Sequence, residues 1–404
     1  MTTVETADGA TASAAPSSTR RRGQVALAVT SLTALGVGCV ALLHSDLHQA
    51  MGGRAFGYAL AFAFVPVLPL SAVFWWLNRA RPEPARLLLL ALLWGALGAT
   101  VISLRLNGWL AGQIGDAAGP RSAIFIAPWV EETAKSAVVF ALVWWRRHDF
   151  NSVAAGVVYG GLAGVGFAFT ENIVYYGQIF QHVLTVRGDG ELAFDAVQDL
   201  FWWRGVAAPF VHPMFTMMTG LGIGLAVRHR HVGVRILAPV AGFCAAALLH
   251  MGYNTVATFT VADALGAVYV GILVPTLLLA IAMIALLRRH ERRVIAARLH
   301  DYTVYGWLRA EHIPFIVTMA GRRSARHYAG TLGRAERVKV RRYQRTGMDL
   351  GVLRDRLVRG VAGEKELARE RELISAIRSQ QAAVVLPGVP PPAAAGVSSL
   401  ASSW

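Results

Sequence analysis

The sequence predicts an all-α fold: a polytopic transmembrane helical bundle of about eight spans, followed by a cytoplasmic C-terminal tail that is part helical and part disordered. Hydrophobic residues make up 55% of the 404-residue chain and charged residues only 16%. Apolar runs of roughly 20 residues, the length that a helix needs to cross a bilayer, recur along the chain. Arginines gather at every second connection between these runs. Together these observations exclude an ordinary soluble globule.

The predicted elements follow one another in a simple order. Residues 1–24 are rich in Thr, Ala and Ser, which predicts a disordered cytoplasmic N-terminus. A membrane domain of residues 25–287 follows, and its first run is interpreted as an uncleaved span because no clear cleavage site comes after it. The predicted spans are Val25–Leu43, Ala55–Leu77, Leu87–Leu104, Ile124–Trp145, Ser152–Tyr176, Val206–Val227, Ile236–Phe259 and Ala264–Leu287.

The chain becomes polar and basic after residue 287. Residues 288–380 predict a basic cytoplasmic segment with a solvated helix or two, and residues 381–404, rich in Pro, Ala, Gly and Ser, predict a disordered end. The formal charge of +15 favours contact with the lipid bilayer, and no nucleic acid partner is expected. Because the arginine-rich connections lie on the side of both termini, we expect both termini to be cytoplasmic.

One outer connection is unusually long. Residues 177–204 carry four acidic residues and the aromatic run Phe201-Trp202-Trp203. Tryptophans are enriched at headgroup depth, so this connection is interpreted as an interfacial anchor, with a lid over a site as the alternative.

Four spans carry ionisable side chains inside their apolar runs, where an unpaired charge costs roughly 2.5–3.5 kcal/mol. These residues are Glu131, Glu132 and Lys135 in the fourth span, Glu171 beside Asn172 in the fifth, His212 in the sixth, and His250 with Asn254 in the seventh. In the predicted topology the four spans place them at one depth, roughly 8–14 Å below the outer surface. Scattered structural residues would have no reason to share a depth, so the convergence predicts one functional site.

Each residue also has a structural interpretation. Glu131 and Lys135 are spaced i,i+4 and could form a private ion pair. A lone intramembrane histidine usually forms a hydrogen bond between helices. A private pair would nevertheless leave Glu132 and Glu171 unexplained, which favours the functional interpretation.

Two further patterns fit a site of this kind. Gly156, Gly160 and Gly164 recur at four-residue spacing, which predicts close packing of the fifth span against a neighbour. Pro213 removes a backbone donor beside His212, which predicts a water-filled cavity there. Carboxylates and imidazoles in such a cavity can activate water, stabilise an oxyanion or bind a metal such as zinc. Hydrolysis of a peptide bond within the membrane fits these parts.

The ordered set Glu131-Glu132-x-x-Lys135, Phe167-x-x-x-Glu171-Asn172, His212 and His250-x-x-x-Asn254 resembles the PrsW family of intramembrane proteases. That family is part of a wider group with the CAAX-prenyl proteases and the bacteriocin-processing (Abi) enzymes. The resemblance covers roughly residues 25–287 and implies a multi-spanning protease, usually described as a metalloprotease. Some members make the first cut in a membrane-bound anti-sigma factor, on its extracytoplasmic side.

The resemblance also implies roles for single residues. It implies that Glu131 activates the attacking water and that His250 and Asn254 stabilise the oxyanion. The prenyl-protease relatives have a histidine where this chain has Glu171, so the site here is richer in carboxylates.

We therefore expect an intramembrane endopeptidase of a bacterial plasma membrane that cleaves a single-span membrane protein. The expected catalytic residues are Glu131, Glu132, Glu171, His212, His250 and Asn254. A divalent metal is expected, with zinc as the ion, and its expected ligands are Glu132, Glu171, His212 and His250. A proton-coupled transporter or channel is the alternative, because buried Glu and His chains also relay protons. A non-catalytic scaffold is a third interpretation.

Overall fold

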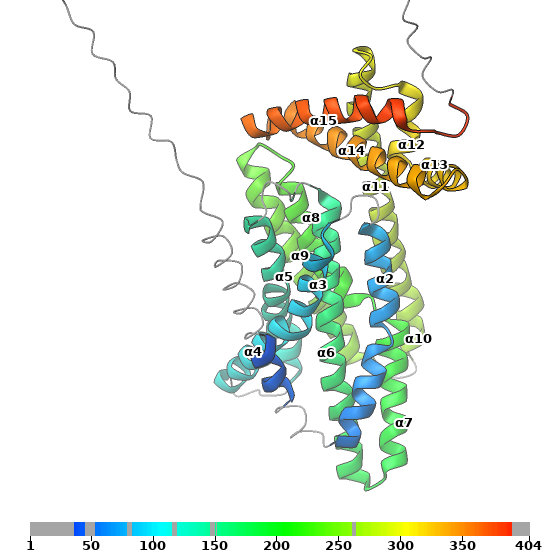
Figure 1. Cartoon of the computed structure of the whole chain (residues 1–404). Helices are drawn as coiled ribbons and strands as arrows, with labels where there is room; N and C mark the ends of the chain where they lie inside the picture. Colours follow the sequence, from blue (N-terminus) through cyan, green and yellow to red (C-terminus); the bar gives the residue numbers. More distant parts are fainter. Residues whose placement is uncertain are drawn as a thin grey trace, which may run out of the picture.

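The structure is a computed structural model that describes residues 36–44, 53–78, 83–114, 119–145, 150, 152–260 and 264–389. Within these ranges the secondary structure is helical and contains no strand. The all-α prediction is therefore confirmed. A bundle of long helices is joined at one end to a smaller helical domain (Figure 1). The expectations for residues 1–24 and for residues 390–404 lie outside the described ranges.

The bundle consists of α-helices, several of which continue directly into a short π-helical segment. Helical residues 36–44 and 53–64 come first. The elements that follow are α2 (Val67–Asn78), α3 (Ala85–Leu93), η1 (Trp94–Ala99), α4 (Thr100–Ile114), η2 (Ser122–Ile126), α5 (Ala127–Trp145), α6 (Val153–Arg187), α7 (Gly190–Phe201), η3 (Trp202–Ala207), α8 (Val211–Ala226), α9 (Val232–Phe259), α10 (Leu265–Val268), η5 (Tyr269–Leu273) and α11 (Val274–Val304).

Six continuous helices are long and apolar enough to cross a membrane. They are Gly53–Asn78, Ala85–Ile114, Val153–Arg187, Gly190–Ala226, Val232–Phe259 and Gly266–Val304. They correspond to six of the eight predicted spans. The predicted fourth span is helical as α5, but its three ionisable residues set it apart from these six. The predicted first span, Val25–Leu43, lies mostly outside the described residues.

α6 is the central helix of the bundle. In its most apolar stretch 89% of the residues are buried, against 6% in the helix Gly266–Val304 at the periphery. Glycines let α8 approach α6 closely, because a Cβ on Gly156, Gly160 or Gly164 would lie only 2.1–2.6 Å from a backbone oxygen of α8. The predicted close packing of this span is therefore confirmed.

The connection 177–204, predicted as an outer loop, is helical instead. α6 continues to Arg187, and the chain turns at Gly188, whose φ of 69° favours glycine. α7 then returns toward the bundle, and the side chain of Asp189 caps it by accepting hydrogen bonds from two backbone N–H groups. This hairpin forms the end of the molecule opposite the smaller domain (Figure 1).

The smaller domain has a hydrophobic core of its own. Its elements are η6 (Ala310–His312), α12 (Ile313–Val317), α13 (Met319–Thr331), α14 (Arg334–Val358) and α15 (Glu364–Ala383). They pack around the last turns of α11, so that Leu299, Tyr343 and Ile377 share one buried cluster with Val384 and Leu386. Residues 288–389 therefore form a folded unit, instead of a solvated helix or two with disorder from residue 381.

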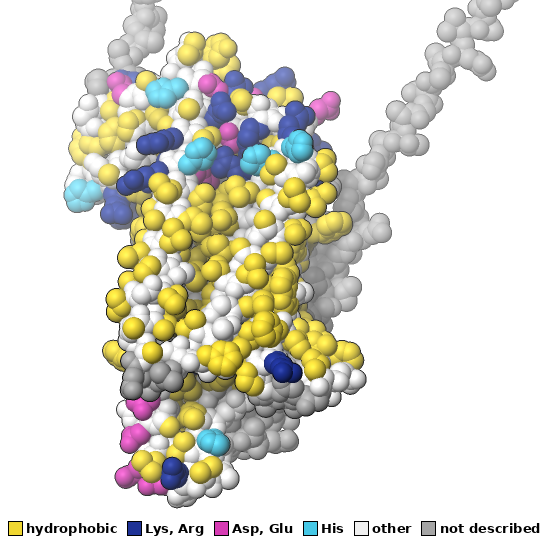
Figure 2. Space-filling view, turned by 180° about the vertical axis from the view of Figure 1, so that it is seen from behind, with side chains coloured by type: hydrophobic (Ala, Val, Ile, Leu, Met, Phe, Trp, Pro, Cys, Tyr) yellow, Lys and Arg dark blue, Asp and Glu magenta, His cyan; other side chains and the backbone are white. Residues whose placement is uncertain are grey.

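The outer surface of the bundle is apolar. Large hydrophobic side chains such as Leu237, Leu278 and Leu279 are between 59% and 70% exposed. Figure 2 shows such side chains covering the bundle, while Lys and Arg side chains gather over the smaller domain. Exposed apolar surface on this scale is compatible with lipid and not with water. The chain is thus a multi-pass membrane protein.

Candidate active site

The ionisable residues of four helices meet inside the bundle. Glu131, Glu132 and Lys135 come from α5, Glu171 from α6, His212 from α8 and His250 from α9. Ion pairs and hydrogen bonds connect all six side chains. Five of them belong to residues that are at most 7% exposed, and the Glu171 side chain is 14% exposed. A hydrogen-bonded cluster this well buried must satisfy its polar atoms from within.

Lys135 stands at the centre of the cluster. Its Nζ lies 2.7 Å from Oε1 of Glu132 and 3.5 Å from Oε2 of Glu131. The i,i+4 spacing allowed Glu131 and Lys135 to form an exclusive ion pair. That interpretation is wrong, because Lys135 lies closer to its i,i+3 neighbour, Glu132. Nζ also lies 3.2 Å from Nδ1 of His212 and 4.1 Å from the centre of the Phe167 ring. One ammonium group thus links α5 to α6 and α8.

Glu132 is surrounded by hydrogen-bond donors. The hydroxyl of Thr216 donates to its Oε2 at 3.0 Å, and Nδ1 of His250 lies 3.1 Å from its Oε1. Together with Lys135, these groups supply the hydrogen bonds that a carboxylate loses when it is removed from water. Their contacts fix Glu132 and, through it, the orientation of the His250 ring.

Arg204 supplies the cation that Glu171 lacks in its own stretch of sequence. Its guanidinium lies 2.6 Å from Oε2 of Glu171, and its Nε donates to Oδ1 of Asn172 at 2.8 Å. The same Glu171 oxygen is 2.7 Å from Nε2 of His212. Because an ammonium can only donate, Nδ1 of His212 accepts from Lys135, and Nε2 carries the proton that it donates to Glu171.

Glu131 has the longest polar contacts of the three carboxylates. Its Oε2 is buried and accepts no hydrogen bond from any described residue. The nearest groups are the ammonium of Lys135 and Nε2 of His250, which lies 3.7 Å away. A buried oxygen in this condition is costly, so a water, an ion or a ligand beside it would be strongly stabilised.

The side chains around this oxygen fit a divalent metal. One ligand atom each from Glu131, His212 and His250 lie within 4.8 Å of one another. Two imidazoles and one carboxylate are a known donor set for catalytic zinc. Each imidazole also places its other nitrogen against a carboxylate, Glu171 for His212 and Glu132 for His250, as metal-binding histidines do. The arrangement thus favours Glu131 as a ligand in place of Glu132 and Glu171, which the sequence had suggested.

Asn254 forms its described hydrogen bond outside the cluster. Its amide Nδ2 donates to the backbone carbonyl of Ala123 at 2.8 Å, which ties α9 to the π-helical segment before α5. The oxyanion role that the resemblance implies for Asn254 stays a prediction.

The sequence predicted a water-filled cavity beside His212. In the structure, aromatic side chains pack against this histidine instead. Pro213 lies in the first turn of α8, where no backbone donor is required. The His212 ring packs against the rings of Phe167 and Phe215, with centroids 5.6 and 5.9 Å away. The described side chains therefore leave this histidine only 3% exposed.

An apolar cavity of about 460 Å³ adjoins the site on one side. It lies among η3, α8, α9 and η5, and Arg204, Phe215 and Tyr253 are among the residues that line it. Phe215 separates the cavity from the cluster, since its ring stacks on His250 with centroids 4.9 Å apart. The cavity thus reaches the edge of the buried polar groups from the lipid-facing side of the bundle.

Sequence reasoning missed two residues of the site. Arg204 was placed in an outer connection, although a lone arginine after an aromatic run could have indicated a buried partner. Thr216 lies four residues after His212, on the same face of α8, but a threonine in an apolar helix gives no signal of its own. Only the packing of α8 against α5 shows its contact with Glu132.

A comparison with protein families matches residues 83–285, about half of the chain, to the family described as PrsW family intramembrane metalloprotease. All the clustered residues lie within the matched range. No curated protein and no solved structure matches the chain.

Proposed function

This chain belongs to the PrsW family of intramembrane metalloproteases, and on that premise we propose that it hydrolyses a peptide bond of a membrane-bound protein. The observation that carries the proposal is the buried cluster in which carboxylates and imidazoles from four helices share hydrogen bonds. Purely structural polar residues could pair within their own helices. Here every member of the cluster also contacts a residue of another helix.

Glu131 acts as the general base that accepts a proton from the attacking water. Its Oε2 has no hydrogen-bond partner among the described residues, so this oxygen has the capacity to accept a hydrogen bond from the attacking water. The ammonium of Lys135 lies 3.5 Å from this oxygen and offsets part of the cost of burying a carboxylate here. A positioned general base contributes typically about 10²–10⁴-fold to the rate.

Nε2 of His250, Nδ1 of His212 and one carboxylate oxygen of Glu131 would hold a divalent metal, for which zinc is the expected ion. The ion would take the place of the Lys135 ammonium at Nδ1 of His212, and the other Glu131 oxygen would remain as the base. When bound, such an ion supplies Lewis-acid chemistry, which polarises a carbonyl and makes water more acidic. Glu132 and Glu171 hold the imidazole rings in place. Arg204 in turn fixes Glu171, so that both rings are oriented before a substrate arrives.

The apolar cavity beside Phe215 is the proposed route of the substrate to the site. A single-span protein has apolar side chains that suit a cavity lined mainly by Leu, Val and Ala side chains. Because a helix protects its own peptide bonds, the substrate must unwind locally, and Arg204 and Tyr253 offer polar atoms to its freed backbone.

We place the cleavage on the extracytoplasmic side and take an anti-sigma factor as the candidate substrate. The basic smaller domain supports a cytoplasmic position for its end of the bundle. Glu131 lies in the second turn of α5, a helix whose first residue is Ala127. In the expected topology that end of α5 is the outer one.

Comparative proteomics tests the proposal without a known substrate. Membranes from cells that carry the wild-type chain or Glu131→Gln are compared for single-span proteins with shortened ectodomains. We expect the fragments to fall at least 100-fold in Glu131→Gln. Glu191→Gln, an exposed carboxylate in α7, is the matched control and should leave the fragments unchanged.

Identical fragment patterns in wild type and Glu131→Gln would contradict the proposal. Proton uptake into proteoliposomes that contain the wild-type chain separates the transporter alternative from proteolysis. Metal content of the purified variant then shows whether the Glu131 carboxylate also binds an ion.

A further inference from the structure

The helical hairpin of α13 and α14 carries an unbalanced positive charge. The 27 residues from Met319 to Arg345 include nine Lys or Arg residues and a single acidic residue, Glu336. Glu336 pairs with Lys339 at 2.7 Å, so it already serves one of the nine. The segment therefore carries a formal charge of +8.

Five arginines of this hairpin lie close enough to influence one another. Arg337, Arg341 and Arg345 follow at four-residue spacing on one face of α14, and all three are exposed. Arg326 of α13 faces them: burial and then Arg341, Arg337 and Arg345 lower its pKa. The pKa of Arg322 is lowered to about 10 by burial and by Arg326, Arg288 and Arg345. We call Arg337, Arg341, Arg345, Arg326 and Arg288 the basic face; Arg322 is buried and is not counted in it.

Most of the described ion pairs of the smaller domain lie outside this segment. Asp355 contacts Arg228, Arg298 and Arg359. On α15, Glu366, Glu370 and Glu372 contact Arg356, Arg354 and Arg369. These arginines all lie outside the segment Met319–Arg345, so these ion pairs neutralise arginines other than those of the hairpin.

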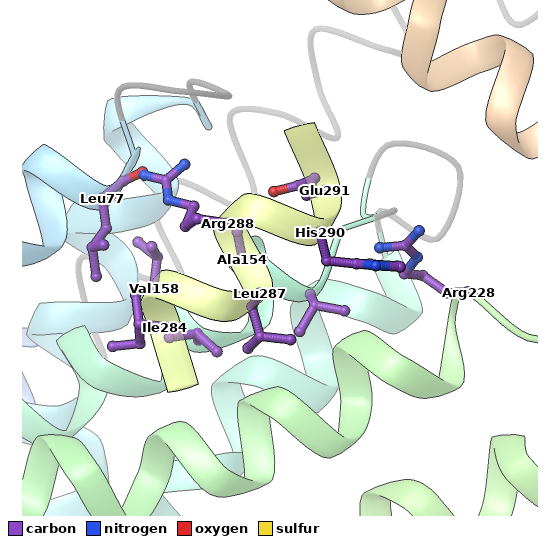
Figure 3. A pocket seen from close by; sticks show the side chains of 11 residues that line it. Leu77, Ala154, Val158, Arg228, Ile284, Leu287, Arg288, His290 and Glu291 are labelled. Atoms are coloured by element: carbon purple, nitrogen blue, oxygen red, sulfur yellow. The ribbon is translucent and has the colours of Figure 1, made fainter. Parts of the chain in front are cut away.

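The basic face begins at the boundary of the apolar bundle. Arg288 follows the apolar run of the last membrane helix, and its guanidinium donates to the backbone carbonyl of Leu77 near the end of α2. Figure 3 shows Arg288 extending toward Leu77 beside a small apolar cavity that Val158 and Ile284 also line. This contact places the first member of the face at the level where α2 leaves the bundle.

The rest of the basic face extends sideways from that level. Figure 1 shows α13 and the adjoining end of α14 projecting beyond α11 and α2. In Figure 2, Lys and Arg side chains form a band next to the apolar surface of the bundle. Leu332 at the tip of the hairpin is 51% exposed, and Val338 on α14 is 55% exposed. Arginines with exposed apolar residues beside them are typical of surfaces that lie on lipid headgroups.

We propose that the basic face binds the phosphate groups of anionic phospholipids in the leaflet beside the smaller domain. The planar guanidinium groups can donate two hydrogen bonds to one phosphate, and the arginine stripe on α14 presents several such groups along one line. Leu332 inserts among the acyl chains nearest the headgroups. Lipid bound in this way fixes the smaller domain against the membrane and through α11 against the bundle.

Lipid titration of the delipidated full-length chain tests this proposal. The protein in nonionic detergent is titrated with dioleoyl-phosphatidylglycerol or dioleoyl-phosphatidylcholine, and native mass spectrometry counts the bound lipids. We expect a preference for phosphatidylglycerol that falls about 100-fold in R337Q/R341Q/R345Q, since each arginine near an anionic surface is worth about fivefold. The control R369Q/R371Q/R378Q removes the same charge from α15 and should keep the preference.

The outcomes that would overturn the proposal are distinct. An equal loss of the phosphatidylglycerol preference in both triple variants would assign the effect to net charge. A wild-type chain without any preference for phosphatidylglycerol would show that the basic face is not a lipid-binding site. Stronger competition by inorganic phosphate or by a short RNA than by the lipid would assign the face to a soluble ligand. All three arginines are exposed, so an unchanged gel-filtration profile is expected for the variant.

Discussion

A fully buried carboxylate such as Glu132 depends on the donors that its neighbours supply. Lys135 and His250 are ionisable, but Thr216 contributes a neutral hydroxyl whose loss changes no charge. Removing that donor leaves a buried carboxylate oxygen without its partner, and a hydrogen bond to a charged group is worth about 1.5–3 kcal/mol. The hydroxyl therefore offers a clean way to test whether the position of Glu132 matters for activity.

We predict that Thr216→Val lowers kcat for peptide-bond cleavage by about tenfold or more, while Thr216→Ser retains the activity. Thr219→Val is the matched control on the same helix, because the buried Thr219 hydroxyl has no hydrogen-bond partner among the described residues. Cleavage rates of the purified variants in detergent provide the measurement. Equal losses in Thr216→Val and Thr219→Val would show that the contact with Glu132 is not important.

The contact of α6 with α8 decides where the site lies. The two helices approach at glycines, and at Gly160 a Cβ would lie 2.6 Å from the backbone oxygen of Thr216. Backbone atoms cannot move aside as a flexible side chain can, so a methyl group there must push the helices apart. The same displacement moves Thr216 away from Glu132, which couples the packing of two elements to the chemistry of the cluster.

We predict that Gly160→Ala destabilises the bundle by about 1–3 kcal/mol, the usual cost of overpacking, and reduces cleavage. Gly252→Ala in α9 is the control, because a Cβ there meets no atom within 4 Å. This substitution should be neutral or stabilising, since alanine favours a helix over glycine by up to about 1 kcal/mol. Thermal unfolding in detergent compares the two, and a larger loss in Gly252→Ala would contradict the packing argument.

At the scale of the whole molecule, the chain is a membrane bundle with a second core beside it. α11 belongs to both units, because it crosses from the bundle into the core that contains Leu299. His312 is 2% exposed in that second core, and its Nδ1 lies 2.8 Å from the hydroxyl of Tyr343. Burial, followed by the charge of Arg309, lowers the pKa of His312 to about 4.

This histidine predicts how the stability of the smaller domain depends on pH. The folded domain keeps His312 neutral, whereas the unfolded chain takes up a proton near the ordinary pKa of 6.5. The stabilisation is therefore complete above about pH 6.5 and is lost as the pH falls toward 4, by about 2 kcal/mol between pH 7 and pH 5.

Amide hydrogen exchange of α12 and α14 at pH 7 and pH 5, corrected for intrinsic rates, measures this loss. His312→Phe should abolish the pH dependence, and the exposed His327→Gln should keep it. An unchanged pH dependence in His312→Phe would assign the effect to another group.

The sequence predicted the helical bundle and the shared depth of its polar residues because both depend on local patterns. Long apolar runs identify spans, and counting residues along them locates Glu131, Glu171, His212 and His250. Pairings between helices follow different rules. The contact of Arg204 with Glu171 depends on how η3 packs against α6, which no spacing along the chain encodes.

The second core was missed for a related reason. Its helices are rich in arginine, so their few apolar positions resembled those of solvated helices. Tyr343 and Ile377 are 34 residues apart in sequence, and only tertiary packing brings them together. The distinction between a solvated helix and a small domain therefore rested on contacts that the sequence pattern did not show.

The most direct test of one shared hydrolytic site is a comparison of single and double variants. The cleavage rate of a single-span substrate found by the proteomic comparison is measured for wild type, Glu131→Gln, His250→Gln and the double variant after reconstitution. Residues that act as a unit are not additive, so each single variant should lose at least 100-fold and the double variant should be no slower than the worse single variant. Losses that multiply in the double variant, or full activity in either single variant, would contradict the account.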